Sequence, residues 1–301
     1  MKRPVALIIR DGWGINPSGV EGATRDGNAV LLSKTPFHHD MATRYPRATL
    51  QCSGEEVGLP EGQMGNSEVG HLNLGAGRIV YQDLTRISKA IREGELARNG
   101  VLQTALAKAK EVGGAVHFIG LLSDGGVHSH QEHLHALIAV AKAAGVRDIL
   151  VHALMDGRDT SPTGGRGYLA DLVRAMATIG AGEIATIVGR YFGMDRDRRW
   201  ERVKKAWDAI VHGVGEAAKD PVKAVEAQYA AGVTDEFMTP IVLNGSRRPI
   251  IKDGDSIVFF NFRSDRGRQL SQPFLFDDFA GFDLGGRPKV HYVTMTVYDK
   301  T

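Results

Sequence analysis

The segment Ala115-Val-His-Phe-Ile-Gly-Leu121 is an almost continuous apolar run that predicts a buried strand. A polar loop follows it, and then Gln131–Ala144, whose apolar spacing predicts a helix. The same order of strand, loop and helix recurs in 148–179 and 183–212, and another apolar run follows at Ser256–Phe260. Such alternation predicts an α/β fold with a mainly parallel sheet and helices on both faces. Further helices are predicted at 83–93, 101–112 and 219–231.

The first part of the chain is expected to add two more strands. Val5–Arg10 predicts a buried strand that ends at Asp11, and Ala48–Ser53 predicts a second, with a helix at 36–45 between them. A carboxylate just beyond a strand is a common metal ligand or catalytic acid, although an aspartate that stabilises a turn is the alternative. In a parallel sheet, Asp11 and Ser67 would lie at the same edge.

Residues 60–78 read Pro-Glu-Gly-Gln-Met-Gly-Asn-Ser-Glu-Val-Gly-His-Leu-Asn-Leu-Gly-Ala-Gly-Arg and are rich in glycine. Glycine permits positive φ angles and lets the backbone approach a ligand closely. Ser67 lies in the middle, and a short helix that follows it would favour an anion at its N-terminus. The segment therefore predicts a serine presented to a phosphate, with a glycine-rich surface loop as the alternative.

Composition limits the function classes. The 301 residues are 43% hydrophobic and 24% charged, which is ordinary for a globular protein. A net charge of +2 gives no case for nucleic-acid binding. The single cysteine, Cys52, cannot form an internal disulfide, which favours a reducing cytosol. The apolar runs are too short for a signal peptide or a membrane span, so we expect a cytoplasmic protein without membrane or nucleic-acid partners.

Polar side chains follow each strand of the alternation, and arginines recur among them. Because the carboxyl ends of parallel strands meet at one edge of the sheet, these side chains should converge where α/β proteins bind ligands. The planar guanidinium pairs with both phosphate and carboxylate, so the pattern predicts a small polyanion that carries both groups. The arginines are Arg158, Arg190, Arg196, Arg263 and Arg266.

A cluster of histidines permits another hypothesis, a metal site like those of metal-dependent hydrolases. Its members are His128, His130, His133 and His135. However, His133 and His135 fall inside the predicted helix, and residues two apart on a helix do not share a face. We therefore favour His128 as a hydrogen-bond donor to an anion.

In order, the chain carries Asp11-Gly-Trp-Gly, Met64-Gly-Asn-Ser-Glu-Val-Gly-His-Leu-Asn, Ser123-Asp-Gly-Gly-Val-His-Ser-His, Asp156-Gly-Arg-Asp, Gly189-Arg-Tyr-Phe with Asp195-Arg-Asp-Arg-Arg-Trp, and Phe260-Asn-Phe-Arg-Ser-Asp-Arg. These segments closely resemble the cofactor-independent phosphoglycerate mutases, a family of the alkaline-phosphatase superfamily. The resemblance implies a phosphatase-like domain that holds two divalent metal ions, Mn²⁺, and an inserted α/β transferase domain that holds the substrate.

The resemblance also implies residue roles. Ser67 resembles the nucleophile that becomes phosphoserine and a metal ligand, and Asp11 resembles a second metal ligand. Asp159 could exchange a proton with the 2- or 3-hydroxyl of the substrate. The residues that match the family's phosphoglycerate-binding positions are His128, Arg158, Asp159, Arg190, Arg196, Arg263 and Arg266. The implied activity is that of an isomerase of glycolysis and gluconeogenesis, a monomer that interconverts 3-phosphoglycerate and 2-phosphoglycerate.

Domain boundaries follow from the same resemblance: 1–81 for the N-terminal part of the phosphatase-like domain, 82–297 for the transferase domain, and 298–301 for the start of a second linker. Members of the family continue beyond this point, and that part supplies the remaining metal ligands. We therefore expect an N-terminal fragment that binds phosphoglycerate weakly and turns it over poorly or not at all. Arg10 departs from the family, which has an apolar residue there.

Two other functions stay open at this point. One is another metal-dependent enzyme of the same superfamily, either a phosphatase or a phosphomutase such as phosphopentomutase. Release of free phosphate, or isomerisation of other phosphosugars, would identify that class. The other is a non-catalytic phosphoglycerate-binding protein, which need show no dependence on manganese.

Overall fold

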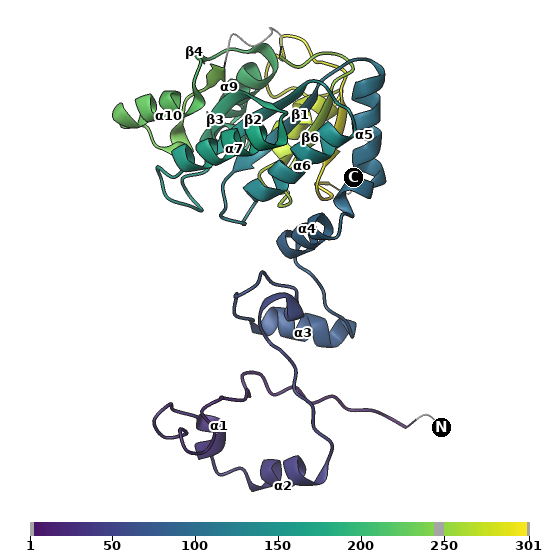
Figure 1. Cartoon of the computed structure of the whole chain (residues 1–301), viewed down its shortest axis with the longest axis vertical. Helices are drawn as coiled ribbons and strands as arrows, with labels where there is room; N and C mark the ends of the chain where they lie inside the picture. The colour runs from purple at the N-terminus through teal and green to yellow at the C-terminus, as the bar shows by residue number, and fades with distance from the viewer. Residues whose placement is uncertain (1–2, 244–249, 300–301) are drawn as a thin grey trace. The chain divides into compact units, whose positions relative to one another are not determined.

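The computed structural model of the chain describes residues 3–243 and 250–299. The chain divides into two compact units, Met1–Gln82 and Asp83–Thr301, whose elements are labelled in Figure 1. Of the predicted linker 298–301, Lys300 and Thr301 lie outside the described residues. None of the helices in the described ranges combines the length and the apolar character that a bilayer span needs.

A sheet forms the centre of the second unit, and seven strands belong to it within the described residues, in the order β4-β5-β3-β2-β1-β6-β7. Neighbouring strands run parallel except β3 and β5, which are antiparallel, so the predicted mainly parallel sheet is confirmed. The strands are β1 Val116–Leu122, β2 Ile149–Met155, β3 Glu183–Gly189, β4 Glu216–Ala218, β5 Ile241–Leu243, β6 Ser256–Phe259 and β7 His291–Thr294.

Helices connect these strands, and the predicted ones are confirmed to within a few residues. The predicted helix Gln131–Ala144, for example, is α6, which ends one residue earlier. The helices of this unit are α4 Asp83–Arg92, α5 Gly100–Glu111, α6 Gln131–Ala143, α7 Gly165–Ile179, α8 Arg190–Gly193, α9 Trp200–His212, α10 Pro221–Ala230 and α11 Arg268–Leu275.

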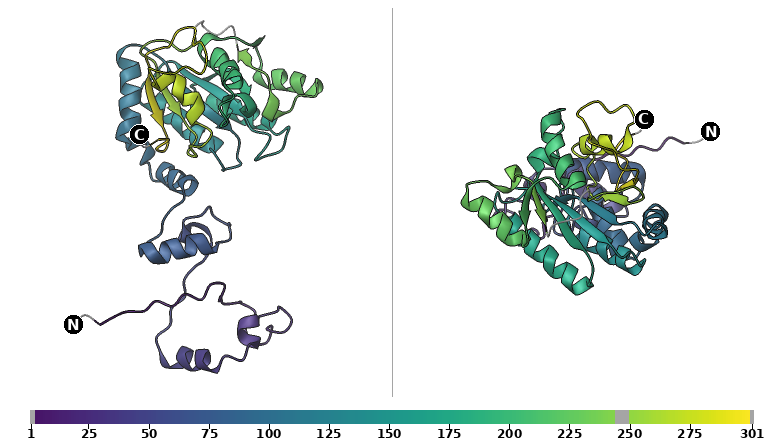
Figure 2. Two further views of the ribbon diagram at one scale, coloured as in Figure 1. Left: turned by 180° about the vertical axis from the view of Figure 1, so that it is seen from behind. Right: turned by 90° about the horizontal axis from the view of Figure 1, so that it is seen from above.

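The helices cover both faces of the sheet, as the view from above in Figure 2 shows. Successive strand residues point to opposite faces. From β1, Phe118 packs into a core with α5, α6 and α7, whereas Ile119 and Leu121 pack into a second core with α9 and α11. Trp207 of α9 is fully buried in the second core. Burial on both faces explains why these strands are nearly continuous apolar runs.

Several short elements were not predicted: β4, β5, β7, α8 and α11. Each strand among them has only three or four residues, which is too few to show a period in the sequence. Helix α11 contains Pro273, which argues against a helix in a sequence-based interpretation. These elements form because the large central sheet supplies their partners.

The first unit contains short helices and no paired strands among its described residues. The prediction of strands at Val5–Arg10 and Ala48–Ser53 is wrong, because both segments are extended but exposed, and only an isolated bridge joins Ser53 to Met64. A strand needs a neighbour to pair its backbone groups. The predicted helix at 36–45 is confirmed. The helices are α1 Ala29–Leu32, α2 Pro36–Arg44, the 3-10 turn Gly54–Val57 and α3 Ser67–Ala76.

Candidate functional site

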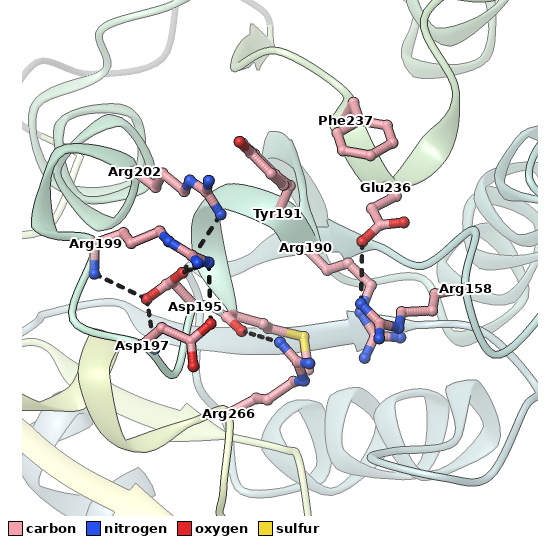
Figure 3. A pocket seen from close by; sticks show the side chains of 11 residues that line it. Arg158, Arg190, Tyr191, Asp195, Asp197, Arg199, Arg202, Glu236, Phe237 and Arg266 are labelled. Carbon is pink, nitrogen blue, oxygen red and sulfur yellow. Dashed lines mark hydrogen bonds and ion pairs between the residues drawn. The ribbon is translucent and has the colours of Figure 1, made fainter.

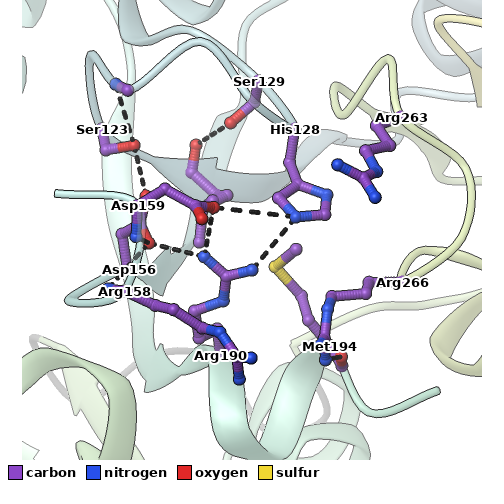
Figure 4. Close-up of polar contacts among 12 residues, drawn as sticks. Ser123, His128, Ser129, Asp156, Arg158, Asp159, Arg190, Met194, Arg263 and Arg266 are labelled. Atoms are coloured by element: carbon purple, nitrogen blue, oxygen red, sulfur yellow. Dashed lines mark hydrogen bonds and ion pairs between the residues drawn. The ribbon is translucent and has the colours of Figure 1, made fainter.

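The candidate site lies at the carboxyl ends of β1, β2, β3 and β6, where polar residues follow each strand (Figure 4). Ser123 follows β1, Asp156 follows β2 and Arg190 follows β3 directly. Asn261 comes shortly after β6 and accepts a hydrogen bond from the backbone N–H of Leu121 at 2.9 Å. The register of the parallel strands therefore brings together side chains that are far apart in the sequence.

Arg190 is the centre of this site, and only 3% of its surface is exposed. Its Nη1 donates to Asp156 Oδ1 and to Asp159 Oδ2, both at 2.6 Å. Its Nη2 lies 3.1 Å from Nε2 of His128, which must accept because the guanidinium can only donate. Arg190 thus links the loops that follow three strands of the sheet.

Asp156 fixes the loop that carries Arg158 and Asp159. Its Oδ1 accepts from their backbone N–H groups at 3.2 and 3.0 Å, and its Oδ2 accepts from the Ser123 hydroxyl at 2.7 Å. Burial alone would raise the pKa of Asp156, but these hydrogen bonds and the charge of Arg190 outweigh it and lower the pKa. Sequence reasoning gave Asp156 no role, although its place directly after a strand was the available signal.

His128 is 3% exposed and is held neutral. Burial, followed by the charge of Arg190, lowers its pKa to about 4. Because Nε2 accepts from Arg190, the proton of the neutral ring resides on Nδ1. Nδ1 is buried and makes no hydrogen bond within the described structure. It is a free donor for a ligand oxygen, and the ring lies between Arg190 and Arg263 (Figure 4).

A pocket of about 310 Å³ adjoins these side chains (Figure 3). Of the predicted binding residues, Arg158, Arg190 and Arg266 line it, whereas the other four are not among the lining residues. Most of the wall comes from residues that sequence reasoning did not assign. They are Tyr191, Met194, Asp195, Asp197, Arg199, Arg202, Glu236 and Phe237.

The structure brings the five predicted arginines into one neighbourhood. Burial, and then the positive charges of Arg196, Arg190 and Arg158, lower the pKa of Arg266. Such mutual repulsion is costly unless anions compensate it, and carboxylates do so here. The pairs are Arg190 with Asp156 and Asp159, Arg158 with Glu236, and Arg196 and Arg263 with Asp265.

Asp195 shapes the loop at the other end of the pocket. Its side chain is 3% exposed, and Oδ1 accepts from the backbone N–H groups of Asp197 and Arg199 at 2.8 and 3.0 Å. Oδ2 lies 3.7 Å from a guanidinium nitrogen of Arg202. The guanidinium carbon of Arg202 in turn lies 3.8 Å from the centre of the Tyr191 ring. In the sequence, the alternating charges at 195–199 were the signal that could have identified this loop. The sequence analysis assigned only Arg196 a role in binding.

The other histidines of the cluster are held by different contacts, although the ring centres of His130 and His133 lie 5.7 Å apart. His130 caps α6, His133 Nε2 lies 2.9 Å from the Ser88 hydroxyl, and His135 Nε2 is buried without a hydrogen-bond partner. In the described ranges, no three His, Cys, Asp or Glu side chains are grouped so that they could hold a metal ion. The histidine-rich metal site is therefore not supported.

Ser67 and Asp11 belong to the first unit and are both exposed. Ser67 begins α3, where Asn66 caps the helix by accepting from Val69 N at 3.0 Å. His71 Nδ1 lies 2.8 Å from the Ser67 carbonyl, which can only accept, so this nitrogen is protonated and cannot act as the base for the Ser67 hydroxyl 3.2 Å away. Asp11 lies in a turn. Two exposed candidate ligands without a third do not fit a complete metal centre.

Arg10, which departs from the family pattern, has clear contacts. One of its terminal nitrogens lies 2.9 Å from His38 Nδ1, and its guanidinium carbon lies 4.5 Å from the centre of the Trp13 ring. Trp13 Nε1 in turn lies 3.4 Å from His38 Nε2. Arg10 therefore joins the beginning of the chain to α2 instead of entering a buried strand.

Comparisons with known proteins give one consistent result. A family described as BPG-independent PGAM N-terminus matches residues 87–300. Two proteins named 2,3-bisphosphoglycerate-independent phosphoglycerate mutase, from Akkermansia muciniphila and Moorella thermoacetica, are 53% and 50% identical over 99% and 100% of the chain. The chain covers 58% of each of them, so it spans less than two thirds of the length of these curated relatives.

A solved structure gives the same answer at the level of the fold. It is described as phosphoglycerate mutase of Leishmania mexicana at low cobalt concentration, and it matches with a TM-score of 0.71 and 35% sequence identity. The match covers 90% of this chain and 52% of the Leishmania chain.

Proposed function

The chain belongs to the family of 2,3-bisphosphoglycerate-independent phosphoglycerate mutases, and on that premise we propose that its second unit holds phosphoglycerate while the 3- and 2-phospho isomers interconvert. The observation that carries the proposal is the group of arginines around Arg190 and His128 at the strand ends. Guanidinium forks recognise carboxylate and phosphate bidentately, and this ligand carries both groups.

The charge of the site supports a ligand of this kind. Four of the five predicted arginines pair with the carboxylates Asp156, Asp159, Glu236 and Asp265, whereas Arg266 donates to the carbonyl of Met194. At pH 7 a phosphate monoester carries a charge of about −1.5 to −2, to which the carboxylate of the glycerate adds another. A ligand with this charge can satisfy guanidinium groups that the protein carboxylates satisfy only in part. The neutral His128 would add the N–H donor of its Nδ1.

Asp159 is proposed to move the proton of the reacting hydroxyl. Its Oδ2 accepts from Arg190, which keeps the carboxylate in place beside the proposed ligand. A general base must lie within hydrogen-bond reach of the proton that it abstracts. Over the whole reaction, Asp159 would carry a proton from the hydroxyl that receives the phosphoryl group to the oxygen that loses it.

Ser67 is proposed to accept the phosphoryl group, with retention on the serine making the overall reaction an isomerisation. Two Mn²⁺ ions remain our expectation as cofactors, and a relative studied with cobalt supports the use of divalent metal. When bound, such ions would stabilise the serine alkoxide and neutralise the transferring phosphoryl. Asp11 and Ser67 would supply only part of their ligands, so we derive no step through them.

We also propose the domain limits that the family resemblance implies: 1–81 for the metal-binding part and 82–297 for the substrate-binding part. The latter overlaps residues 87–300, which the family model matches, and this overlap supports the proposed limits. We further propose that the protein is a cytoplasmic monomer. Its ligands would be small molecules, without nucleic-acid or membrane partners.

The experiment that tests it is calorimetric titration of the 301-residue chain with 3-phosphoglycerate and, separately, with 3-hydroxybutyrate, which lacks the phosphate. We expect saturable binding of the phosphoglycerate alone. Isomer formation is then followed by ³¹P NMR with added Mn²⁺. Absence of phosphoglycerate binding would exclude the proposed role of the second unit, and release of free phosphate without isomerisation would favour a phosphatase.

A further inference from the structure

The carboxylate of Asp265 lies among three groups that point toward one position. Its Oδ2 accepts from Arg196 Nη1 at 3.1 Å, and its Oδ1 accepts from Arg263 Nε at 3.1 Å. The same Oδ1 lies 3.7 Å from Nδ1 of His128, beyond hydrogen-bond distance. A carboxylate of the protein itself therefore occupies the neighbourhood in which these donors converge.

The three donors are not equally satisfied by Asp265. Nδ1 of His128 is buried and has no hydrogen-bond partner among the described residues, and a buried unpaired N–H costs free energy comparable to a lost hydrogen bond. The side chains of Arg196 and Arg263 are 48% and 50% exposed, so each can reorient at little cost. An anion that reached Nδ1 as well as both guanidinium groups would satisfy all three donors better than Asp265 does.

We propose that Asp265 acts as an internal anion, which holds Arg196 and Arg263 around the anion position in the free chain and which the ligand displaces. This inference rests on the proposed function, because it assigns a role within the same binding site. It has a consequence for selectivity: a ligand must carry enough charge to compete with a carboxylate that is already in place. Nearby positive charges, Arg263 first, offset the effect of burial and lower the pKa of Asp265, which keeps it ionised.

The decisive variant is Asp265→Asn, which keeps the size of the side chain and removes its charge. Exposed ion pairs are individually weak, so loss of the two pairs should tighten binding by about three- to tenfold. The probes are 3-phosphoglycerate and inorganic phosphate, titrated calorimetrically into the full chain. We expect the gain to be larger for inorganic phosphate, because it lacks the carboxylate and competes less well with Asp265.

Asp171→Asn is the matched control. Asp171 pairs with Arg174 on α7 and is not among the residues that line the pocket. Its replacement removes the same charge, yet it should change either affinity by less than about twofold. A thermal melt of each variant checks that the fold is kept, and Asp265→Ala repeats the comparison if the amide variant is unstable.

The outcomes separate this inference from the proposed function. Failure of the unmodified chain to bind 3-phosphoglycerate counts against the proposed function, whereas the inference is judged by inorganic phosphate alone. Tighter phosphate binding by Asp265→Asn but not by Asp171→Asn supports it. Weaker binding would show that Asp265 positions the arginines instead of competing for them. Equal changes in both variants, or no phosphate binding by any variant, would overturn it as well.

Discussion

Arg190 Nη1 donates to Asp156 Oδ1 over 2.6 Å, and the two side chains are only 3% and 1% exposed. A charge pair this well buried is stable only because each partner has further contacts. Asp159 and His128 also contact Arg190, and the Ser123 hydroxyl donates to Asp156. Removing one partner of such a pair leaves the other charge buried without compensation, which costs far more than the net value of the pair.

We therefore predict that Asp156→Ala lowers the free energy of unfolding by about 3–5 kcal/mol. Asp156→Asn should cost less, because the amide oxygen can still accept from the backbone N–H groups of Arg158 and Asp159. Both variants should also weaken the binding of 3-phosphoglycerate, since Arg190 loses a fixed position. Urea unfolding, followed by calorimetry, measures the two effects.

The control for this prediction is Asp171→Ala. Asp171 forms an ion pair with Arg174 on α7, and both side chains are substantially exposed. Exposed pairs of this kind contribute about 0–1 kcal/mol. Equal losses of stability in the Asp156→Ala and Asp171→Ala chains would contradict the view that burial gives the Arg190–Asp156 pair its importance.

A second prediction concerns ligand binding by Arg158, which lines the pocket and is 54% exposed. Arg158→Gln should weaken 3-phosphoglycerate binding by about ten- to a hundredfold, because a charge-assisted hydrogen bond contributes about 1.5–3 kcal/mol. Stability should change little, since the ion pair that Arg158 forms among the described residues, with Glu236 at 3.6 Å, is exposed on the arginine side. Isothermal titration gives the affinity.

Arg166→Gln is matched to this variant. Arg166 is 61% exposed and pairs with Glu226 at 3.4 Å, but it does not line the pocket. The same change of charge should therefore leave the affinity nearly as it was. If both variants weaken binding equally, the effect comes from the net charge of the domain and Arg158 does not contact the ligand.

The central sheet could be predicted because its strands and helices are long and buried. Residues 116–122 of β1 are all buried, and burial on both faces produces the apolar run that identified this strand. The arginines could be placed at one edge for the same reason, since parallel strands end together. By contrast, β5 has three residues and runs antiparallel to β3, which no pattern in the sequence distinguishes from a loop.

The predicted strands of the first unit failed for a different reason. Val5 and Ile8 are apolar enough for a buried strand, yet they are 95% and 83% exposed. A sequence pattern shows that a segment is suited to a sheet, but the sheet forms only where neighbouring strands pair with it. The roles of Asp156 and Asp265 could not be predicted, because their partners Arg190 and Arg196 are far away in the sequence and become neighbours only in the folded chain.

A third prediction follows from buried neutral histidines. Burial, and then the charge of His130, lowers the pKa of His133 to about 4 from its ordinary value of 6.5. Between these two pH values His133 is protonated in the unfolded chain but neutral in the folded chain. The contribution of His133 to the free energy of unfolding is therefore complete above pH 6.5 and decreases as the pH falls toward 4. Each such histidine contributes a slope of about 1.4 kcal/mol per pH unit in that window.

His133→Gln should remove one such contribution, which urea unfolding at several pH values between 6.5 and 4.5 would detect. Ser88→Ala is the control: it removes the hydrogen bond between the Ser88 hydroxyl and His133 Nε2 but leaves the ring in place. That variant should lose stability at every pH and keep the slope. An unchanged slope in His133→Gln would mean that His133 does not titrate between the two states.

The last prediction concerns Gly157, in the turn that carries Arg158 and Asp159. Its φ is +65°, and a Cβ there would lie 2.8 Å from Asp235 Cβ and from Glu236 N. A left-handed alanine costs about 1–2 kcal/mol, and overpacking adds about 1–3 kcal/mol. Gly157→Ala should therefore destabilise the chain by at least about 2 kcal/mol and weaken phosphoglycerate binding, because the turn must move.

Gly167→Ala provides the comparison that isolates the geometry of the turn. Gly167 lies within α7, its φ is not positive, and a Cβ there would meet nothing within 4 Å. Alanine in a helix interior is favoured over glycine by about 0.5–1 kcal/mol, so this chain should become slightly more stable and bind as before. Chemical denaturation of both variants measures the free energy of unfolding, and calorimetry measures the affinity for 3-phosphoglycerate. If Gly157→Ala is as stable as Gly167→Ala, the turn after β2 is not constrained as described, and Arg158 and Asp159 do not owe their positions to it.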